Sequence, residues 1–404
     1  MMNSITTGAT AAIIAEYNPF HNGHRLHIAR TRERCGAENV VVIMSGNYVQ
    51  RGECAIADKF SRTRMAIEGG ADLVLELPLP FACAGAEKFA GGGVEIADAL
   101  GCVDYLSFGM ESADGGELTA AANAVSDAAL KPELDRLLGE GKSFAAARTE
   151  AVRMLYGDAA AEIICMPNNT LAVEYIRALK RLNSGIVPVG VQREGAAHDS
   201  EVISGDIASA TAVRRMILEG RLDESGRYLP EYSFRELERL INEEKAPADV
   251  KVCERAVLSR LRGMTREQLA RLPDISEGLE NRIYECVRRA CSVEELYDSI
   301  KSKRYSHARI RRIILSAFLG IRREHSDGPR YIRILGMNER GKRLLSSASP
   351  KLPLISSYRQ AMALPQEARN HYLLECYADD LWGLMTPGIQ PCGADMASKL
   401  IVVS

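Results

Sequence analysis

Five short runs of apolar, largely β-branched residues alternate with helical patterns through the first half of the chain. The runs are Thr10–Glu16, Asn39–Ser45, Asp72–Leu77, Val103–Phe108 and Ile186–Gln192. Each run is apolar almost without interruption, which is typical of strands that helices cover on both faces. The intervals carry helical patterns near 23–35, 57–70, 86–100 and 170–183, and each is long enough for a crossover between parallel strands. We therefore predict an α/β fold with a Rossmann-like, doubly wound parallel sheet.

The second half of the chain has a different character. The chain of 404 residues exceeds the roughly 250–300 residues that one hydrophobic core supports, so two domains are expected. Helical, charged patterns dominate after Leu222, and we place the boundary near residue 225. The prediction is an α/β domain over 1–225 and a mainly helical domain over 226–404. Helical stretches at 116–126 and 132–156 are expected to form an insertion, and Tyr331–Leu335 has the pattern of a short strand.

Several protein classes are excluded by what the sequence lacks. The longest apolar runs are short, such as Val40–Met44, whereas a membrane span needs about 18–20 apolar residues. The first ten residues hold no lysine or arginine and no signal-peptide core follows, which favours a cytoplasmic protein without a membrane partner. Ten cysteines occur without a C-x-x-C pair, so buried reduced thiols are expected rather than zinc ligands or disulfides.

The segment Ile14–His27 (IAEYNPFHNGHRLH) joins the first predicted strand to the first predicted helix. Ligands of open α/β sheets bind at the carboxyl ends of the strands, and free N–H groups at a helix start attract anions. His21 and His24 flank Asn22-Gly23, so both imidazoles can donate to one phosphate and stabilise the charge that develops as pyrophosphate leaves. This H-x-G-H pattern is similar to that of nucleotidyltransferases and class I aminoacyl-tRNA synthetases, which makes both histidines catalytic candidates. The alternative is a pair of surface histidines at a helix cap.

A second candidate phosphate-binding element lies at Ile207–Arg214 (IASATAVR). Ser209 and Thr211 precede Arg214 at the expected start of a helix, where hydroxyl and N–H groups suit the β- and γ-phosphates of a nucleotide. The nucleotidyltransferase superfamily carries a similar S-x-T-x-x-R element. The alternative is an N-cap serine followed by a solvated arginine.

Positive charge is concentrated in one segment of a chain whose net charge is −2. Thirteen basic and three acidic residues lie between Lys301 and Arg343, a local charge of +10. Such a segment favours a polyanionic partner such as RNA, and interleaved Tyr305 and His307 could stack on bases. The predicted RNA contacts are Lys303, Arg304, Arg309, Arg311 and Arg312. The alternative is a solubilising surface.

With these motifs in view, the chain resembles the bacterial tRNA(Met) cytidine acetate ligase family. The similar stretches include AEYNPFHNGH (15–24), MSGNYVQRGECA (44–55), DLVLELP (72–78), MPNNTLAVEY (166–175), IASATAVRRM (207–216) and SKRYSHARIRR (302–312). The resemblance implies an ATP-dependent ligase in which acetate attacks the α-phosphate of ATP and gives acetyl-adenylate and pyrophosphate. The acetyl group then passes to N4 of the wobble cytidine of elongator tRNA(Met). A small-molecule adenylyltransferase of the same superfamily and a non-catalytic RNA-binding protein are the alternatives.

The resemblance also implies which residues bind ATP. They are Ile14, Ala15, Glu16, Tyr17, Asn18, Pro19, Phe20, His21, Asn22, Gly23, His24, Arg25, Leu26, His27, Gly109, Asn168 and Arg193, with Ser209, Thr211 and Arg214 added from the second element. Taken alone, Gly109, Asn168 and Arg193 would be a turn glycine, an N-cap and a solvated arginine. Lys59 and Arg62 are further candidates for phosphate or RNA contacts, with a solvated helix face as the alternative.

Magnesium is expected to accompany ATP, and the sequence does not identify its ligands. Asp58, Asp72 and Asp199 are the carboxylates that could assist it. Because Mg²⁺ keeps several waters and leans on substrate phosphates, few protein ligands are needed.

Overall fold

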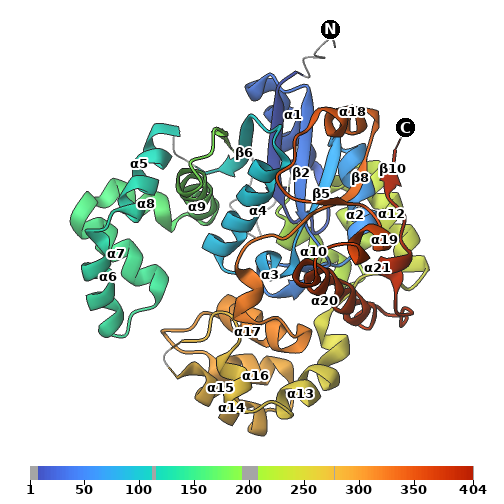
Figure 1. Ribbon diagram of the computed structural model, residues 1–404. Coiled ribbons are helices and arrows are strands. Elements are labelled where there is room, and N and C mark those ends of the chain that lie inside the picture. The colour runs from blue at the N-terminus through green and yellow to red at the C-terminus, as the bar shows by residue number, and fades with distance from the viewer. Residues whose placement is uncertain (1–7, 112–114, 193–207, 277, 404) are drawn as a thin grey trace.

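The structure, a computed structural model, describes residues 8–111, 115–192, 208–276 and 278–403 (Figure 1). Its centre is a mostly parallel sheet whose strands lie in the order β10-β8-β5-β2-β1-β6-β7. The five predicted strands are β1 (Thr10–Ala15), β2 (Asn39–Ser45), β5 (Leu73–Leu77), β6 (Tyr105–Met110) and β7 (Val187–Gln192), and each pairs in parallel with its neighbour among them. The predicted doubly wound α/β fold is confirmed.

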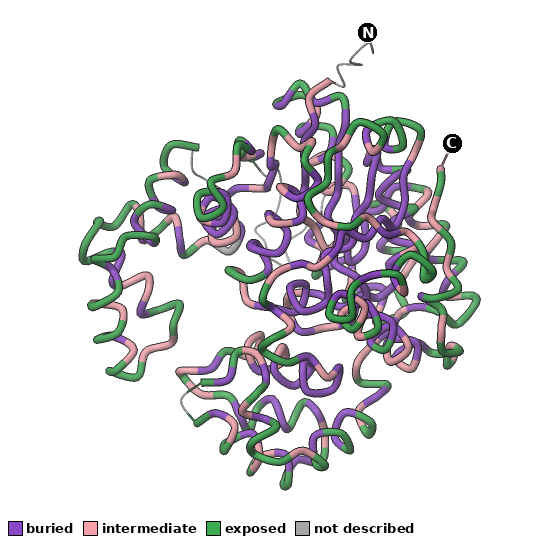
Figure 2. The backbone as a smooth tube through the Cα atoms, viewed as in Figure 1, coloured by how far each residue is buried: buried purple, intermediate pink, exposed green. Residues whose placement is uncertain are grey.

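Successive residues of β2 enter two different cores, which explains its uninterrupted apolar sequence. Val41 and Ile43 pack in a cluster with residues of α4 (Ala86–Leu100) and α9 (Pro167–Arg181). Val40 and Val42 pack on the opposite face with residues of α1 (Asn22–Cys35), α2 (Lys59–Glu68) and α10 (Ala210–Leu218). Because side chains alternate between the faces of a strand, both faces must be apolar when both are covered. Figure 2 shows this buried centre and the more exposed outer helices.

The order of the strands fixes where a ligand can bind. The chain runs from β1 outward to β2 and β5 and then returns to the other side of β1 with β6 and β7. The carboxyl ends of β1 and β6 therefore border the crevice where the winding direction reverses, which is the usual ligand position in such sheets. The turn Glu16–His21 leaves β1 at this point and leads into α1.

Four helices form a lobe between β6 and α9: α5 (Gly115–Ser126), α6 (Leu130–Gly139), α7 (Phe144–Tyr156) and α8 (Asp158–Cys165). The helical stretch expected over 132–156 is two helices, because the chain turns at Gly141, whose φ of +88° favours glycine. The insertion expected in this region is thus a helical cover that packs beside α9.

The chain after residue 226 builds a second helical lobe and then returns to the sheet. Helix α12 (Glu231–Asn242) packs on α2 beside the sheet. The lobe consists of α13 (Glu254–Arg262), α14 (Arg266–Ala270), α15 (Leu279–Arg289), α16 (Val293–Ile300) and α17 (His307–Leu319). The expected strand is β8 (Ile332–Met337), which pairs antiparallel with β5, and β9 (Leu354–Ile355) and β10 (Ile401–Val402) pair with β8. The sheet therefore spans both halves of the sequence, and the domain boundary near 225 stays a prediction.

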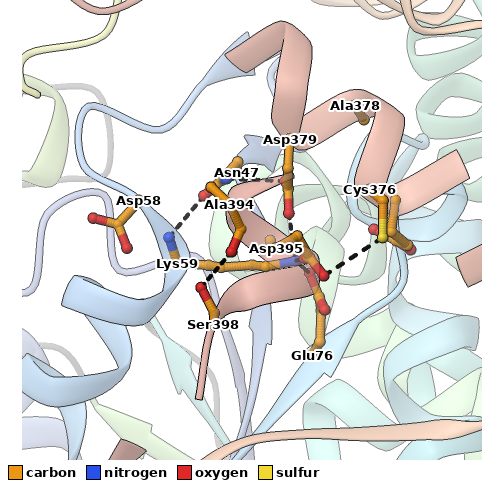
Figure 3. A network of polar contacts seen from close by, with 12 residues as sticks. Asn47, Asp58, Lys59, Glu76, Cys376, Ala378, Asp379, Ala394, Asp395 and Ser398 are labelled. Carbon is orange, nitrogen blue, oxygen red and sulfur yellow. Dashed lines mark hydrogen bonds and ion pairs between the residues drawn. The ribbon is translucent and has the colours of Figure 1, made fainter. Parts of the chain in front are cut away.

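A buried ionic cluster joins the sheet to the end of the chain (Figure 3). Lys59 Nζ lies 2.7 Å from carboxylate oxygens of Glu76 and Asp379 and 2.5 Å from Asp395. Arg333 of β8 binds Asp395 through two nitrogens at 2.7 and 2.8 Å. Asp379 lies on α20 (Gln366–Gly383) and Asp395 on α21 (Ala394–Ala397).

Among the described helices, none combines the length and apolar character that a membrane crossing requires.

The cluster overturns one expectation about α2. Lys59 and Arg62 have no exposed surface, so neither is a phosphate or RNA contact and neither lies on a solvated face. Arg62 donates to the backbone carbonyls of Ala57 at 2.9 Å, Glu16 at 2.7 Å and Ser45 at 3.1 Å. It therefore fixes the carboxyl ends of β1 and β2 against each other. Burial lowers the pKa of Arg62 to about 10, with nearby carboxylates acting in the opposite direction.

Candidate active site

A cavity of about 380 Å³ opens where β1 and β6 end. Its walls come from β1, α1, α4, β6, α9, β7, α10, α17 and the hairpin of β3 (Tyr48–Val49) and β4 (Glu53–Cys54). The predicted residues that line it are Ile14, Ala15, Glu16, Tyr17, Asn18, His21, Gly23, His24, Leu26, His27, Gly109, Asn168, Thr211 and Arg214. The structure thus brings the H-x-G-H turn and the S-x-T-x-x-R element to the same cavity.

Other predicted residues do not contribute to the cavity wall. Pro19, Phe20, Asn22, Arg25 and Ser209 are not among its lining residues. Ser209 caps α10 by accepting a hydrogen bond from Ala212 N at 3.1 Å, and Asn22 Nδ2 donates to the carbonyl of Arg227 at 3.0 Å. Arg193 and Asp199 lie outside the described residues. Direct contact of this group with ATP stays a prediction.

His21 and His24 form a reciprocal cap at the start of α1. Nδ1 of His21 accepts a hydrogen bond from Gly23 N at 3.0 Å, and Nδ1 of His24 accepts one from His21 N at 3.2 Å. A neutral imidazole whose Nδ1 accepts carries its proton on Nε2. The backbone therefore sets both rings in the tautomer that presents an Nε2–H donor, and the rings stack with centroids 3.7 Å apart.

Two aromatic residues hold this pair in place. The ring of Tyr17 lies 4.7 Å from that of His24, and the ring of Phe20 lies 5.7 Å from it. Both aromatic residues are almost fully buried. Tyr17 has a φ of +48°, a left-handed conformation that is costly for a bulky residue and is typically retained at functional sites. The turn is therefore rigid, as a site that positions hydrogen-bond donors requires.

The opposite wall of the cavity is tied to α1 and to α9. His27 Nε2 lies 3.2 Å from Ser107 Oγ on β6, two residues before Gly109. Asn168, in the first turn of α9, donates to Glu111 Oε1 at 2.8 Å. These contacts place the end of β6 and the start of α9 around the same space as the histidine pair.

The β3–β4 hairpin is a part of the site that the sequence reasoning missed. Val49, Gln50, Arg51 and Glu53 line the cavity, as does Arg30 of α1. Gln50 N donates to Glu16 Oε1 at 2.8 Å, and burial raises the pKa of Glu16 against the lowering effect of this hydrogen bond. The sequence signal that could have identified the hairpin is the stretch 44–55, which supports the family resemblance but was not assigned to the ATP site.

Glu53 connects two arginines that come from distant parts of the sequence. One carboxylate oxygen pairs with Arg214 of α10, and the other accepts from Arg311 Nη1 at 2.9 Å. Arg311 had been predicted as an RNA contact, yet its side chain lines the same cavity as the histidine pair. The site therefore includes a residue of the helical lobe.

The other predicted RNA contacts lie around α17 and are partly engaged with the protein. Arg309 donates to the carbonyl of Asp274 and to Ser276 Oγ, both at 2.8 Å, and Arg312 Nε lies 3.1 Å from Asp274 Oδ2. Arg304 donates to the carbonyl of Leu138 at 3.3 Å, whereas Lys303 is exposed. Part of the local positive charge is thus neutralised within the lobe.

The described residues contain no group of three or more histidine, cysteine, aspartate or glutamate side chains that could hold a metal ion. Asp58 accepts from the N–H groups of Phe60 and Ser61 at the start of α2, both at 2.9 Å. Asp72 accepts from Arg32 at 2.5 Å and from Val40 N at 2.8 Å. These two carboxylates have structural partners and do not line the cavity.

Comparisons with known proteins identify relatives over nearly the whole chain. The family model described as HIGH Nucleotidyl Transferase matches residues 9–394. A tRNA(Met) cytidine acetate ligase from Thermoanaerobacter sp. is 36% identical over 400 residues, covering 96% of this chain and 98% of the relative. One from Acetivibrio thermocellus is 36% identical over 414 residues, covering 97% and 99%.

Solved structures give the same result. The apo crystal structure of Thermotoga maritima TmcAL is 33% identical, with a TM-score of 0.92 and coverage of 98% of this chain and 99% of that one. The crystal structure of the same protein bound with alpha-thio ATP has a TM-score of 0.90 at 33% identity, covering 98% and 100%.

Proposed function

Because the chain belongs to the HIGH nucleotidyl transferases and, among them, to the tRNA(Met) cytidine acetate ligase family, we propose that it uses ATP and acetate to form N4-acetylcytidine at the wobble position of elongator tRNA(Met). The observation that carries this proposal is the pair of imidazoles whose Nδ1 atoms are occupied by backbone N–H groups. Both histidines line the cavity that Thr211 and Arg214 also line.

In the first step, a carboxylate oxygen of acetate attacks the α-phosphorus of ATP. The bond between this phosphorus and the bridging oxygen to the β-phosphate breaks, and pyrophosphate leaves with that electron pair. Negative charge grows on the phosphate oxygens, where the donors of His21 and His24 stabilise it. Arg214 is suited to the β- and γ-phosphates, since a guanidinium offers several donors to phosphate oxygens.

In the second step, N4 of cytidine attacks the acetyl carbonyl of the adenylate. A C–N bond forms, the bond from the acetyl carbon to the phosphate oxygen breaks, AMP leaves, and N4 loses a proton. AMP is a good leaving group, whereas N4 is poorly basic, so alignment of the two reactants supplies the main acceleration. The cytidine must leave its stack to reach the cavity, at a cost of a few kcal/mol.

The proposed partner is elongator tRNA(Met), with contacts at Lys303, Arg304, Arg309, Arg311 and Arg312. Charged side chains on α17 and the loop before it border the cavity through Arg311, so an anticodon loop bound there would bring its bases near the adenylate. A tRNA substrate implies a cytoplasmic site of action. Mg²⁺ is proposed to enter with ATP, bound to phosphate oxygens and water.

The test is exchange of labelled pyrophosphate into ATP, with and without tRNA. We expect exchange that requires acetate but no tRNA, followed by formation of N4-acetylcytidine in tRNA(Met) detected by nucleoside mass spectrometry. Exchange that requires a phosphate-bearing small acceptor instead of acetate would identify a small-molecule adenylyltransferase. Absence of any exchange with active tRNA binding would identify a non-catalytic RNA-binding protein.

A further inference from the structure

Arg311 occupies a position that its role as an RNA contact does not explain. Its guanidinium lines the cavity with the histidine pair and shares Glu53 with Arg214. The three side chains are only partly exposed, at 33% for Arg311, 20% for Glu53 and 18% for Arg214. One carboxylate therefore holds two guanidinium groups side by side within the wall of the cavity.

The backbone fixes Arg311 in this place. Gly52, at the tip of the hairpin, has a φ of +74°, and a Cβ added there would lie 2.5 Å from Arg312 N and 2.7 Å from the carbonyl carbon of Arg311. The hairpin and α17 thus pack backbone against backbone, a separation that only glycine allows. The same turn of the hairpin is held by the hydrogen bond from Gln50 N to Glu16 Oε1.

The neighbouring arginines of α17 show that this orientation is specific. Of the arginines in this helix, Arg309 and Arg312 face Asp274 and do not line the cavity, whereas Arg311 does. Successive side chains of an α-helix are rotated by about 100° around the helix axis, so adjacent arginines face different surroundings. A solubilising surface has no need for an arginine aimed inward.

The charge balance of the cavity indicates an anionic ligand for these arginines. Arg214 and Arg311 present two guanidinium groups against the single carboxylate of Glu53 in this part of the cavity wall. A carboxylate alone would repel a triphosphate, but one placed between two guanidiniums fixes their positions in advance and leaves an excess of positive charge. Donors held in advance lose little orientational freedom when the ligand arrives.

We propose that Arg311 binds the triphosphate of ATP together with Arg214, and that Glu53 is the positioning residue for both. The helical lobe then takes part in the first chemical step, before tRNA acts. This inference rests on the use of ATP in the proposed function and adds a ligand to that site. The two guanidiniums neutralise the pyrophosphate as it leaves, while the histidine pair serves the α-phosphate.

The test measures ATP binding and exchange separately in the full chain, without tRNA. Arg311→Met keeps the aliphatic stem near Tyr297, whose ring centre lies 5.9 Å from the guanidinium, and removes the charge. We expect the Kd for ATP, from calorimetry, to rise roughly 10–100-fold, as for loss of charge-assisted hydrogen bonds. Arg311→Lys should recover part of the affinity, because the charge returns without the planar, forked donor geometry of a guanidinium. The matched control is Arg322→Ala, which removes one charge from an exposed side chain (60%) of the same lobe and should leave the Kd unchanged.

Glu53→Gln tests the positioning role. It removes a negative charge from the cavity, so ATP should bind at least as tightly, whereas kcat for acetate-dependent exchange should fall about tenfold because the arginines lose their fixed geometry. A higher KM for ATP with unchanged kcat would overturn the positioning role.

If both Arg311 variants bind ATP with the wild-type affinity, the inference is wrong and the proposed tRNA contact remains the role of Arg311. If the wild-type protein binds ATP and Arg311→Met does not, but acetate supports no exchange, the proposed acetate chemistry fails while the assignment of Arg311 holds. Thermal unfolding of each variant checks that the comparison is between folded proteins.

Discussion

Replacement of His24 by alanine tests the chemical role of the imidazole pair most directly. The change removes one Nε2–H donor from the cavity and one acceptor, Nδ1, that takes a hydrogen bond from His21 N at 3.2 Å. It also removes the ring that stacks on His21 and contacts Tyr17. The variant therefore loses a catalytic contact and a structural one, and the experiment must separate them.

The two losses differ in size. Loss of one donor aimed at developing charge costs ~10²–10³ in rate, or about 2.7–4 kcal/mol in the transition state. Loss of a capping hydrogen bond costs about 1 kcal/mol of stability. We therefore expect acetate-dependent exchange to fall ~10²–10³ in His24→Ala while the protein remains folded.

His24→Glu separates the catalytic effect from the structural one. A glutamate three residues after the cap can accept from the N-cap N–H, so the start of α1 should keep its stability. The same glutamate places a negative charge near the phosphates, so exchange should be no faster than in His24→Ala. Arg34→Ala, on an exposed position near the end of α1, is the control and should match the wild type. Exchange by His24→Ala within about threefold of the wild-type rate would refute the reasoning, because such a residue supplies no transition-state stabilisation.

Three further predictions concern the buried cluster and the RNA contacts. Lys59→Met leaves the carboxylates around it without their cation and should lower the free energy of unfolding in urea by about 3–5 kcal/mol; a loss below 1 kcal/mol would contradict the importance of the cluster. Burial, with repulsion from Glu76, raises the pKa of Glu375 to about 8 from 4.5, so the folded state holds this proton more tightly than the unfolded state. The contribution of Glu375 to the free energy of unfolding should be largest below pH 4.5 and should fall as the pH rises to about 8. The variant Glu375→Gln should show a flatter dependence of stability on pH over this range. If the variant and the wild type have the same pH dependence, Glu375 is ionised in the folded protein. Combined replacement of Lys303 and Arg309 by alanine should weaken tRNA binding and reduce its dependence on log salt by roughly one unit per lost phosphate contact, whereas identical filter-binding curves would assign both to a solubilising surface.

The local parts of the site could be read from the sequence because neighbouring residues build them. The strand β1, the turn and the helix α1 follow one another, and the reciprocal cap joins residues three positions apart. The apolar runs predicted the parallel strands for the same reason, since burial on both faces is recorded in each strand separately. The S-x-T-x-x-R element likewise lies within the first two turns of α10, where Ser209 is the cap.

Other features depend on residues that the fold alone brings together. Lys59 and Arg62 of α2 are residue types typical of a surface, yet both are buried. Lys59 pairs with carboxylates of α20 and α21, and Arg62 donates to carbonyls at the ends of β1 and β2. The antiparallel strand β8 joins the sheet after an excursion through the helical lobe.

The sequence alone determined the α/β class, the H-x-G-H turn after the first strand and the family, because each depends on contiguous residues. The tertiary structure determined which charged side chains form ion pairs with one another. Glu53 and Arg311 stand 258 positions apart, and no local pattern links a carboxylate in one hairpin to an arginine in a distant helix. A charged residue has the same preference for secondary structure whether it contacts water, an ion-pair partner or a nucleotide. Its role is therefore determined only by the neighbours that the folded chain places around it.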